Sequence, residues 1–315
     1  MELPAEFRLI ADHFRPLAGP EGLGLADDAA VFAPPAGHDL VISTDAMVEH
    51  THFLPETDPA LLARKLLRVN LSDLAAMGAR PLGYLLTLCL PNTTTNEWLH
   101  GFAGGLAQDQ KSFNFSLFGG DTTGTRGPIM VSVTIIGAVA VGQAVTRAGA
   151  RPGDLIYVTG TIGDGILGLA AARGEIEDPD GYLAGRYRLP MPRNALPIVG
   201  IASAAMDVSD GLVQELGHIA RASRVAMVIR AAAVPLSAAA QRFPERLAQM
   251  LAGGDDYELV LTVPPAQQQR LIDAAAIAAL PLTLIGECVE GEPQVLVLDH
   301  EDRPIEIAST GWSHF

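Results

Sequence analysis

Short motifs that place aspartate beside glycine, serine or threonine recur in both halves of this 315-residue chain. They are Asp27-Asp28, Ser43-Thr44-Asp45, Ser72-Asp73, Gly119-Gly120-Asp121-Thr122-Thr123, Asp207-Val208-Ser209-Asp210 and Gly254-Asp255-Asp256. Hard cations such as Mg²⁺ prefer oxygen ligands, and small neighbours let carboxylates and backbone carbonyls converge. Turns and helix caps use the same residue types, so each motif taken singly also has a structural interpretation. Six motifs together favour metal binding.

Asp73 is the most informative single residue. Asp58-Pro59 resembles an N-cap followed by a first-turn proline, and Gly78 resembles a C-terminal stop, so the segment between them is predicted to be a helix. Its apolar stripe consists of Leu62, Leu66, Val69 and Met77. Asp73 lies on the same stripe, although a buried carboxylate is costly unless it is paired or bound to a metal. The helix is therefore expected to carry a functional acid.

The elements around these motifs predict two α/β domains. The apolar run Leu40 to Ile42 indicates a strand that ends at Ser43-Thr44-Asp45, and the Val- and Ile-rich stretch from Ile129 to Gly142 indicates one or two more strands. In the second half, a strand over Leu155 to Thr159 precedes a glycine-rich turn and a helix through Ala172. Strands and helices alternate afterwards, and Leu259 to Val263 is a further predicted strand. We place the domain boundary at 145, which gives domains 1–145 and 146–315.

Known phosphate-binding motifs are absent or weak in the sequence. No Gly-Lys dipeptide is present, so the P-loop lysine has no candidate, and the protein-kinase motif set is missing. The turn from Gly160 to Gly165 precedes a helix and could offer backbone N–H groups, but its spacing differs from the dinucleotide fingerprint. Taken alone, this turn does not separate a phosphate site from an ordinary turn.

Charge and composition restrict the classes of partner. Acidic residues outnumber basic ones by 36 to 21, and a net charge of -15 opposes binding to nucleic acid or to anionic membranes. No apolar run approaches the roughly 18 residues of a membrane-spanning helix, and no targeting segment is visible at the start. Cys89 and Cys288 match no metal or redox spacing, which suits a reducing compartment. We therefore expect a cytoplasmic enzyme without nucleic-acid or membrane partners.

Taken in order, the motifs resemble the thiamine-monophosphate kinase family, within the superfamily that includes aminoimidazole ribonucleotide synthetase and selenophosphate synthetase. The resemblance covers nearly the whole chain. Its most specific portions are Ser43-Thr44-Asp45 with His52-Phe53, Asn70 to Ala79, Gly119 to Thr123, Asp207 to Gly211 and Gly254 to Leu259.

The resemblance implies a role for individual residues. The implied metal ligands, for several Mg²⁺ ions, are Asp28, Ser43, Thr44, Asp45, Asp73, Asp121, Asp207 and Asp210. The implied ATP contacts are Gly120, Asp121, Arg147 and Ser209, and the implied thiamine contacts are His52, Asp255 and Trp312. The family usually has Glu where this chain has Asp255, which shortens the side chain by one methylene.

The implied reaction is ATP-dependent phosphorylation of thiamine monophosphate to thiamine diphosphate. The acceptor is a phosphate monoester with a second pKa of about 6, so its attacking oxygen is already largely deprotonated and needs no general base. We expect direct in-line transfer, with Asp45, Asp73, Asp121 and Asp210 acting through Mg²⁺. The resemblance also implies a homodimer in which the N-terminal mixed sheets pair into a barrel, and a C-terminal α/β domain that completes the ATP and substrate cleft.

Three other classes of function remain open on the sequence. One is another ATP-dependent ligase or synthetase of the same superfamily. Another is a metal-dependent hydrolase built on His50 and His52, because a His-x-His pair on a strand points both rings to one face. The last is a non-catalytic module that binds ATP but forms no ADP. The intact set of acids argues against this interpretation.

Overall fold

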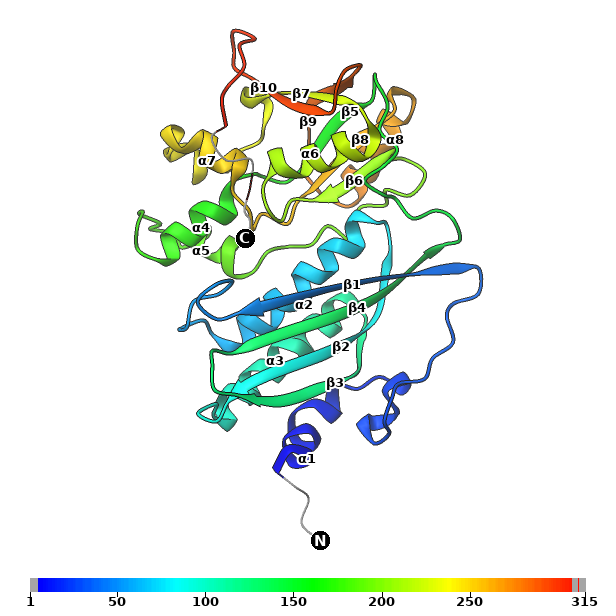
Figure 1. Cartoon of the computed structure of the whole chain (residues 1–315), viewed down its shortest axis with the longest axis vertical. Coiled ribbons are helices and arrows are strands. Elements are labelled where there is room, and N and C mark those ends of the chain that lie inside the picture. Colours follow the sequence, from blue (N-terminus) through cyan, green and yellow to red (C-terminus); the bar gives the residue numbers. More distant parts are fainter. Residues whose placement is uncertain (1–4, 308–310, 312–315) are drawn as a thin grey trace. The chain divides into compact units, whose positions relative to one another are not determined.

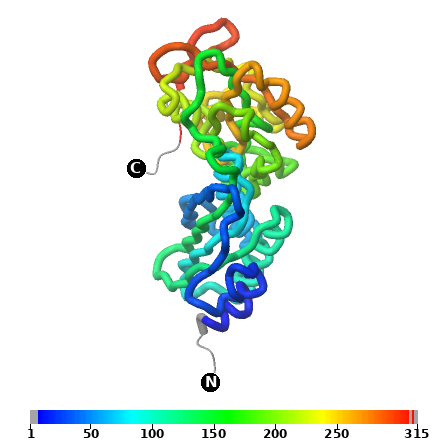
Figure 2. Tube along the Cα trace, turned by 90° about the vertical axis from the view of Figure 1, so that its right-hand side faces the viewer, coloured from blue at the N-terminus to red at the C-terminus, as the bar shows by residue number. Residues whose placement is uncertain are grey.

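The computed structural model describes residues 5–307 and Gly311, and it divides the chain into two units (Figure 1). Unit 1 comprises the chain up to Leu74 together with Ala79–Gly142, and unit 2 comprises Ala75–Gly78 and the chain from Gln143 onward. The chain therefore passes between the units at three points along its trace (Figure 2). The predicted two-domain α/β fold is confirmed, and each unit is described below by itself.

Unit 1 is a four-stranded sheet with two long helices. Its elements are α1 (Ala5–Leu9), β1 (His38–Val48), α2 (Pro59–Ala76), β2 (Arg80–Pro91), α3 (Asn96–Phe113), β3 (Ser116–Thr125) and β4 (Met130–Ala140). The strand order is β1-β4-β2-β3, with β2 and β3 parallel and the other pairs antiparallel. Helices α2 and α3 lie on one side of the sheet (Figure 1). The helix predicted from Asp58 is confirmed, because the Asp58 carboxylate accepts the N–H groups of Ala60 and Leu61.

The core of unit 1 lies between the sheet and these helices. Leu66 and Leu74 of α2, Phe102 of α3 and Tyr84 and Leu88 of β2 are essentially inaccessible to solvent. On the other side of the sheet, Ile42 is 62% exposed and Leu85 is 39% exposed. One face of the sheet is thus covered by helices, and the other presents apolar side chains to solvent.

Unit 2 is a six-stranded mixed sheet with helices on both faces. Its elements are β5 (Leu155–Thr159), α4 (Asp164–Ala172), α5 (Tyr182–Arg188), β6 (Ala204–Asp207), α6 (Leu212–Ser223), β7 (Ala226–Arg230), α7 (Leu247–Ala252), β8 (Leu259–Val263), α8 (Gln268–Ile277), β9 (Leu282–Val289) and β10 (Gln294–Leu298). The strand order is β10-β7-β9-β5-β8-β6. The predicted strands over Leu155–Thr159 and Leu259–Val263 and the helix ending at Ala172 are confirmed.

Alternation along the strands of unit 2 separates two cores. Val158 and Val260 pack with the α6 residue Leu216 on one face, while Tyr157 and Leu261 belong to a core with α8 on the other. Because successive strand residues point to opposite faces, β5 and β8, which are buried and mostly apolar, contribute side chains to both cores. Among the described residues, no helix is long and apolar enough to cross a membrane.

Candidate functional site

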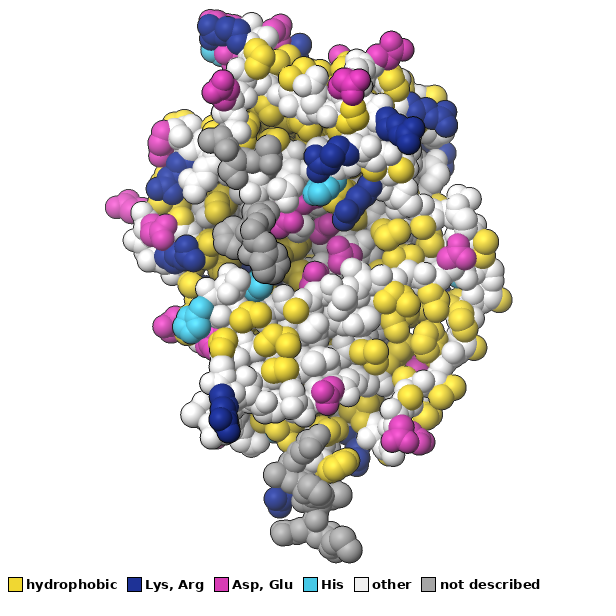
Figure 3. All heavy atoms as spheres, viewed as in Figure 1, with side chains coloured by type: hydrophobic (Ala, Val, Ile, Leu, Met, Phe, Trp, Pro, Cys, Tyr) yellow, Lys and Arg dark blue, Asp and Glu magenta, His cyan; other side chains and the backbone are white. Residues whose placement is uncertain are grey.

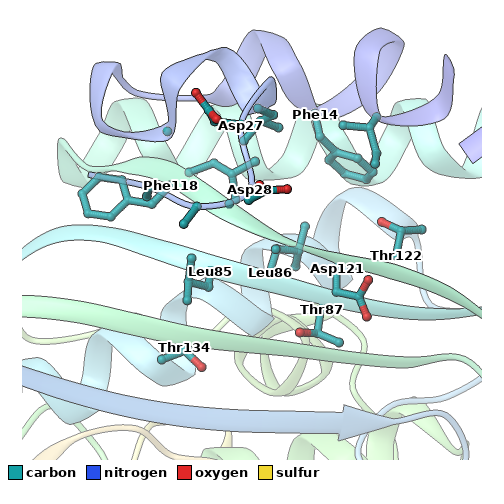
Figure 4. Close-up of a pocket in the computed structure, with 18 of the residues that line it drawn as sticks. Phe14, Asp27, Asp28, Leu85, Leu86, Thr87, Phe118, Asp121, Thr122 and Thr134 are labelled. Atoms are coloured by element: carbon teal, nitrogen blue, oxygen red, sulfur yellow. The ribbon is translucent and has the colours of Figure 1, made fainter. Parts of the chain in front are cut away.

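A pocket of about 680 Å³ lies in unit 1, between the N-terminal segment, residues 7–32, and strands β2 and β3 (Figure 4). Backbone contacts hold the segment in place, because Gly19 donates to the carbonyl of Leu117 and a side chain at Gly22 would lie 2.8 Å from the Phe118 carbonyl. The lining combines apolar residues with three acids, and it includes Phe14, Phe32, Leu86, Phe118, Asp27, Asp28 and Asp121. An apolar cavity of this size with a few polar groups suits a small-molecule ligand.

Gly120 lies where β3 approaches β2 too closely for any side chain. A Cβ atom there would stand 1.9 Å from the carbonyl oxygen of Leu86. Asp121 follows directly, opposite Thr87 in the register, and is exposed at the pocket. The Gly119–Thr123 motif is therefore part of a strand that lines the pocket, and glycine lets the strand place Asp121 there.

A second group of polar residues in unit 1 joins β1 to α2. The Ser43 hydroxyl donates to the Asp73 carboxylate at 2.6 Å, and the backbone N–H of Asp45 donates to Asn70 at 3.1 Å. Asp73 and Asp45 are half-buried. The prediction that a strand ends at Ser43-Thr44-Asp45 is wrong, because β1 continues to Val48 and pairs with β4 along its whole length.

Asp45 and Asp121 are well separated within one chain. Asp45 pairs with Val133 on β4, Val133 pairs with Leu86 on β2, and Leu86 pairs with Gly120 on β3. Three strand spacings put roughly 14 Å of sheet between the two backbones. That distance exceeds the reach of two aspartates that share one ion at about 2.1 Å. In one chain, these two carboxylates therefore cannot share one ion.

The two histidines of the hydrolase alternative do not lie on a strand. His50 has a positive φ of 69° in the turn that follows β1, and His52 Nδ1 accepts the N–H of Val48 at 3.0 Å. Their rings therefore do not share a strand face, which was the basis of that alternative. His52 is instead oriented by the backbone at the end of β1.

Two acidic motifs of unit 2 are held side by side by backbone hydrogen bonds. Beyond the β6–β8 pair, Val208 donates to Glu258, Tyr257 donates to Val208 and Asp255 donates to Ser209, at 2.7 to 2.8 Å. A side chain at Gly254 would stand 2.2 Å from the Ser209 carbonyl, so this pairing requires glycine. Asp207, Asp210 and Asp255 thus come from adjacent segments.

The Gly160–Gly165 turn lies against the same segments. A Cβ atom at Gly165 would stand 2.4 Å from the Asp255 carbonyl carbon. Asp255 has a φ of 70° and Tyr257 a φ of 51°, conformations that non-glycine residues adopt at some cost. The close contact with Gly165 and the positive φ values show that Asp255 lies in a closely packed loop whose backbone conformation is constrained.

Asp256 connects the turn to this loop. Its carboxylate accepts the N–H groups of Gly163 at 2.7 Å and Gly165 at 2.8 Å, and the residue is 1% exposed. Burial raises the pKa of Asp256 well above its ordinary value, against the opposing effect of the two backbone donors. Asp256 belongs to the Gly254-Asp255-Asp256 motif, for which the sequence alone allows either metal binding or a structural role, and these two backbone contacts give it a structural role.

We expect Asp256→Asn to lower the free energy of unfolding by about 1–3 kcal/mol, because the amide NH₂ faces one of the two backbone donors and cannot accept from it. The folded-state pKa of Asp256 is raised, so its stabilising contribution is present at low pH and is lost as the pH rises from the ordinary value of 3.8 through the raised one. The stability difference between wild type and variant should therefore narrow as the pH rises. Denaturant unfolding at several pH values measures it, and a difference that widens with pH would contradict this interpretation.

Glu258 forms a buried ionic cluster under the same loop. It is inaccessible to solvent and accepts from Arg193 at 2.6 Å, from Arg186 at 3.0 Å and from the Thr159 hydroxyl at 2.7 Å. Arg186 also donates to the backbone carbonyl of Asp256 at 3.2 Å. Sequence reasoning missed this cluster, and the only local signal was an acid directly before the apolar run of β8.

Asp210 is held at the start of α6. Its backbone N–H donates to the Glu215 carboxylate at 3.2 Å, and Gln214 donates to its side chain at 3.4 Å. Burial raises the pKa of Glu215 to about 7, and the Asp210 charge acts in the same direction.

The implied ligand set divides between the two units. Unit 1 contains Asp28, Ser43, Thr44, Asp45, Asp73 and Asp121, and unit 2 contains Asp207 and Asp210. Among residues 5–307 and Gly311, no three acids, histidines or cysteines are grouped so that they could hold a metal by themselves. Of the implied substrate contacts, His52 lies in unit 1 and Asp255 in unit 2, while Trp312 lies outside the described residues.

Both units match family models. The AIR synthase related protein N-terminal domain matches residues 26–139, and the corresponding C-terminal domain matches residues 151–299. The chain is thus a two-domain protein of the AIR synthase related class.

Relatives over the full length narrow this class. The chain is 44% identical to a thiamine-monophosphate kinase of Caulobacter vibrioides, with 99% of this chain and 91% of the relative covered, and 41% identical to that of Escherichia coli K12, with 98% of each covered. The chain belongs to the thiamine-monophosphate kinase family. A solved thiamine-monophosphate kinase from Stenotrophomonas maltophilia superposes with a TM-score of 0.84 at 39% identity, over 93% of this chain and 96% of that one. A solved complex of AaThiL with AMPPCP and TMP superposes with a TM-score of 0.79 at 31% identity, over 100% and 99%.

Proposed function

We propose that this protein transfers the γ-phosphate of ATP to thiamine monophosphate, forming thiamine diphosphate and ADP. The observation that carries the proposal is similarity over the full length to thiamine-monophosphate kinases, one of them solved with an ATP analogue and TMP. The acids of every motif named above are present in the chain.

The pocket of unit 1 receives the nucleotide. Its apolar lining suits a purine ring, and the proposed phosphate contacts are Gly120 and Asp121, which line the same pocket. Arg147 and Ser209 of unit 2 supply further contacts to ATP. His52, Asp255 and Trp312 contact the thiamine moiety, and the shorter side chain of Asp255 reaches less far than the usual Glu.

Several Mg²⁺ ions are held by the oxygen-rich set Asp28, Ser43, Thr44, Asp45, Asp73, Asp121, Asp207 and Asp210. The fit is chemical, because carboxylates and hydroxyls are the ligands that Mg²⁺ prefers, and the Ser43–Asp73 and Asp45–Asn70 contacts hold three of these residues in place. Bound Mg²⁺ supplies charge neutralisation for the transferring phosphoryl group. Asp45, Asp73, Asp121 and Asp210 hold the ions, and the acceptor attacks in line without a general base.

The active form is a homodimer in which unit 1 sheets of two copies form a barrel. The face opposite α2 and α3 exposes Ile42 and Leu40 to solvent, and pairing two such faces removes this apolar area from water. β1 and β3 are the two edge strands of the sheet. Pairing of β1 with β3 of a second copy at both edges closes the two sheets into the barrel.

The cytoplasm is the proposed compartment, and both cysteines are free thiols, as a reducing environment requires. Thiamine monophosphate and ATP are the proposed partners, and the net charge of -15 disfavours nucleic acid.

The direct test is conversion of thiamine monophosphate by the purified protein with ATP and Mg²⁺, with thiamine diphosphate and ADP measured together. We expect one ADP for each thiamine diphosphate and no reaction after chelation of the metal. Two kinds of acceptor serve as controls: thiamine, which has no phosphate, and phosphorylated vitamins other than thiamine monophosphate. ADP release without thiamine diphosphate, or turnover that survives chelation, would reject the assignment.

A further inference from the structure

Helix α6 of unit 2 is buried except along one narrow stripe. Every residue from Leu212 to Ala220 is buried apart from Gln214 and His218, which are half-buried, and Arg221, the next residue, is exposed. Residues spaced by three and four positions share one helix face. We call Gln214, His218 and Arg221 the α6 stripe. Figure 3 shows basic side chains gathered beside a histidine on the face where α6 lies.

Arg221 fixes the tautomer of His218. Its guanidinium donates to His218 Nδ1 at 3.1 Å, and an arginine has no acceptor, so Nδ1 must be the unprotonated nitrogen. The ring proton is therefore on Nε2, where it can be donated. Burial lowers the pKa of His218, and the charges of Arg221 and Arg147 act in the same direction, against the smaller opposing effect of the Asp210 charge. Near neutral pH, His218 is thus a neutral N–H donor with a cation beside it.

Hydrogen bonds from Ser223 hold the backbone at Arg147 against the end of the same helix. The Ser223 hydroxyl donates to the Arg147 carbonyl at 3.0 Å and accepts the N–H groups of Gly149 and Ala150 at 3.1 Å each. At the other end of the stripe, Gln214 donates to the Asp210 carboxylate. One side of unit 2 therefore has two cations, Arg147 and Arg221, a neutral donor, His218, and an acid that is proposed to bind metal, Asp210.

We propose that His218 and Arg221, together with Arg147, form a phosphate-binding face that contacts the phosphate oxygens of the reactants. The identity of the reactants rests on the proposed function. A chain with 36 acids and 21 bases repels anions over most of its surface, so phosphates need local cations and N–H donors. Arginine supplies a fixed fork of donors for phosphate, and His218 adds a donor whose direction Arg221 sets.

Equilibrium titration of the full chain tests the proposal without turnover. The probes are a non-hydrolysable ATP analogue with Mg²⁺, thiamine monophosphate, and adenosine, which has no phosphate. We expect His218→Ala and Arg221→Ala to weaken at least one phosphate probe by about tenfold or more, and to leave adenosine unchanged. The probe that is weakened identifies the donor or the acceptor phosphate. Arg242→Ala, which removes another exposed arginine of unit 2, is the matched control.

The stripe residues are partly or fully exposed, so the variants should keep the melting temperature of the wild type, which is measured in parallel. The proposal is overturned if both variants bind both phosphate probes as the wild type does, or if adenosine is weakened equally. Turnover of thiamine monophosphate by the wild type is recorded separately. Its absence rejects the proposed function, whereas the titrations still decide whether the stripe binds phosphate.

Discussion

Replacing Asp121 with Asn is expected to lower the rate of thiamine diphosphate formation by roughly 100-fold or more, the size of effect seen when one charge-stabilising group is lost from an active site. Asp121 is exposed at the unit 1 pocket, where its carboxylate is proposed to hold Mg²⁺ beside the nucleotide phosphates. Asparagine has nearly the same shape but no charge, so it binds a hard cation much more weakly. The rate is measured across a series of Mg²⁺ concentrations.

Asp39→Asn is the matched control for this substitution. Asp39 is also an exposed aspartate of the same sheet, and it accepts the N–H of Gly142 at 2.8 Å, a bond that an asparagine oxygen can still make. We expect this control to retain the wild-type rate. We also expect Asp121→Asn to require more Mg²⁺ while its melting temperature is retained. Wild-type turnover with unchanged Mg²⁺ dependence would remove Asp121 from the site.

Glu258→Gln is expected to lower the free energy of unfolding by about 3 kcal/mol. Glu258 is inaccessible to solvent and accepts from both Arg186 and Arg193. Asp164 lies 3.8 Å from Arg186, so the loss of the Glu258 charge mainly leaves Arg193 facing an uncharged amide. Removing one partner of a buried ion pair typically costs about 3–5 kcal/mol. The arginine side chains are 15% and 16% exposed, so water relieves part of the cost and the lower end applies. Calorimetric unfolding measures the change.

A double variant separates this charge effect from a loss of packing. If the uncompensated cations cause the instability, Glu258→Gln combined with Arg193→Gln should be more stable than Glu258→Gln alone. If the double variant is instead less stable by the sum of the two single effects, the residues act independently and the ionic interpretation fails. We also expect Glu258→Gln to weaken the binding of thiamine monophosphate more than the binding of ATP. The reason is that Arg186 of this cluster donates to the backbone carbonyl of Asp256, which follows Asp255 in the loop.

Elements with strong local signals were predicted well. The N-cap at Asp58 and the apolar stripe predicted α2, and short apolar runs bounded by glycine predicted β5 and β8. These signals depend on neighbours within a few residues, such as the hydrogen bonds from Ala60 and Leu61 to Asp58. Local patterns of this kind can be read without knowledge of the fold.

Strand extent was predicted poorly where the strand carries polar residues. Ser43-Thr44-Asp45 was interpreted as the end of a strand, yet it lies inside β1, and no strand was predicted at Gly119–Thr123, which lies inside β3. Pairing with β4 continues β1 through Asp45, and pairing with β2 continues β3 through Asp121. The partners are remote in sequence, so no local pattern in either motif indicated the pairing.

The sequence by itself determined the kinds of chemical group present, the two-domain α/β class and the family. Only the tertiary structure decided which groups meet. Ser43 and Asp73 are 30 positions apart, and Thr159 and Glu258 are 99 apart, yet each pair forms a hydrogen bond of 2.7 Å or less. The structure also separated Asp45 from Asp121 by two strands and placed Asp256 and Glu258 beneath the Asp255 loop. The physical reason is that residue type and spacing encode local preference, whereas sheet order and burial arise from contacts distant in sequence.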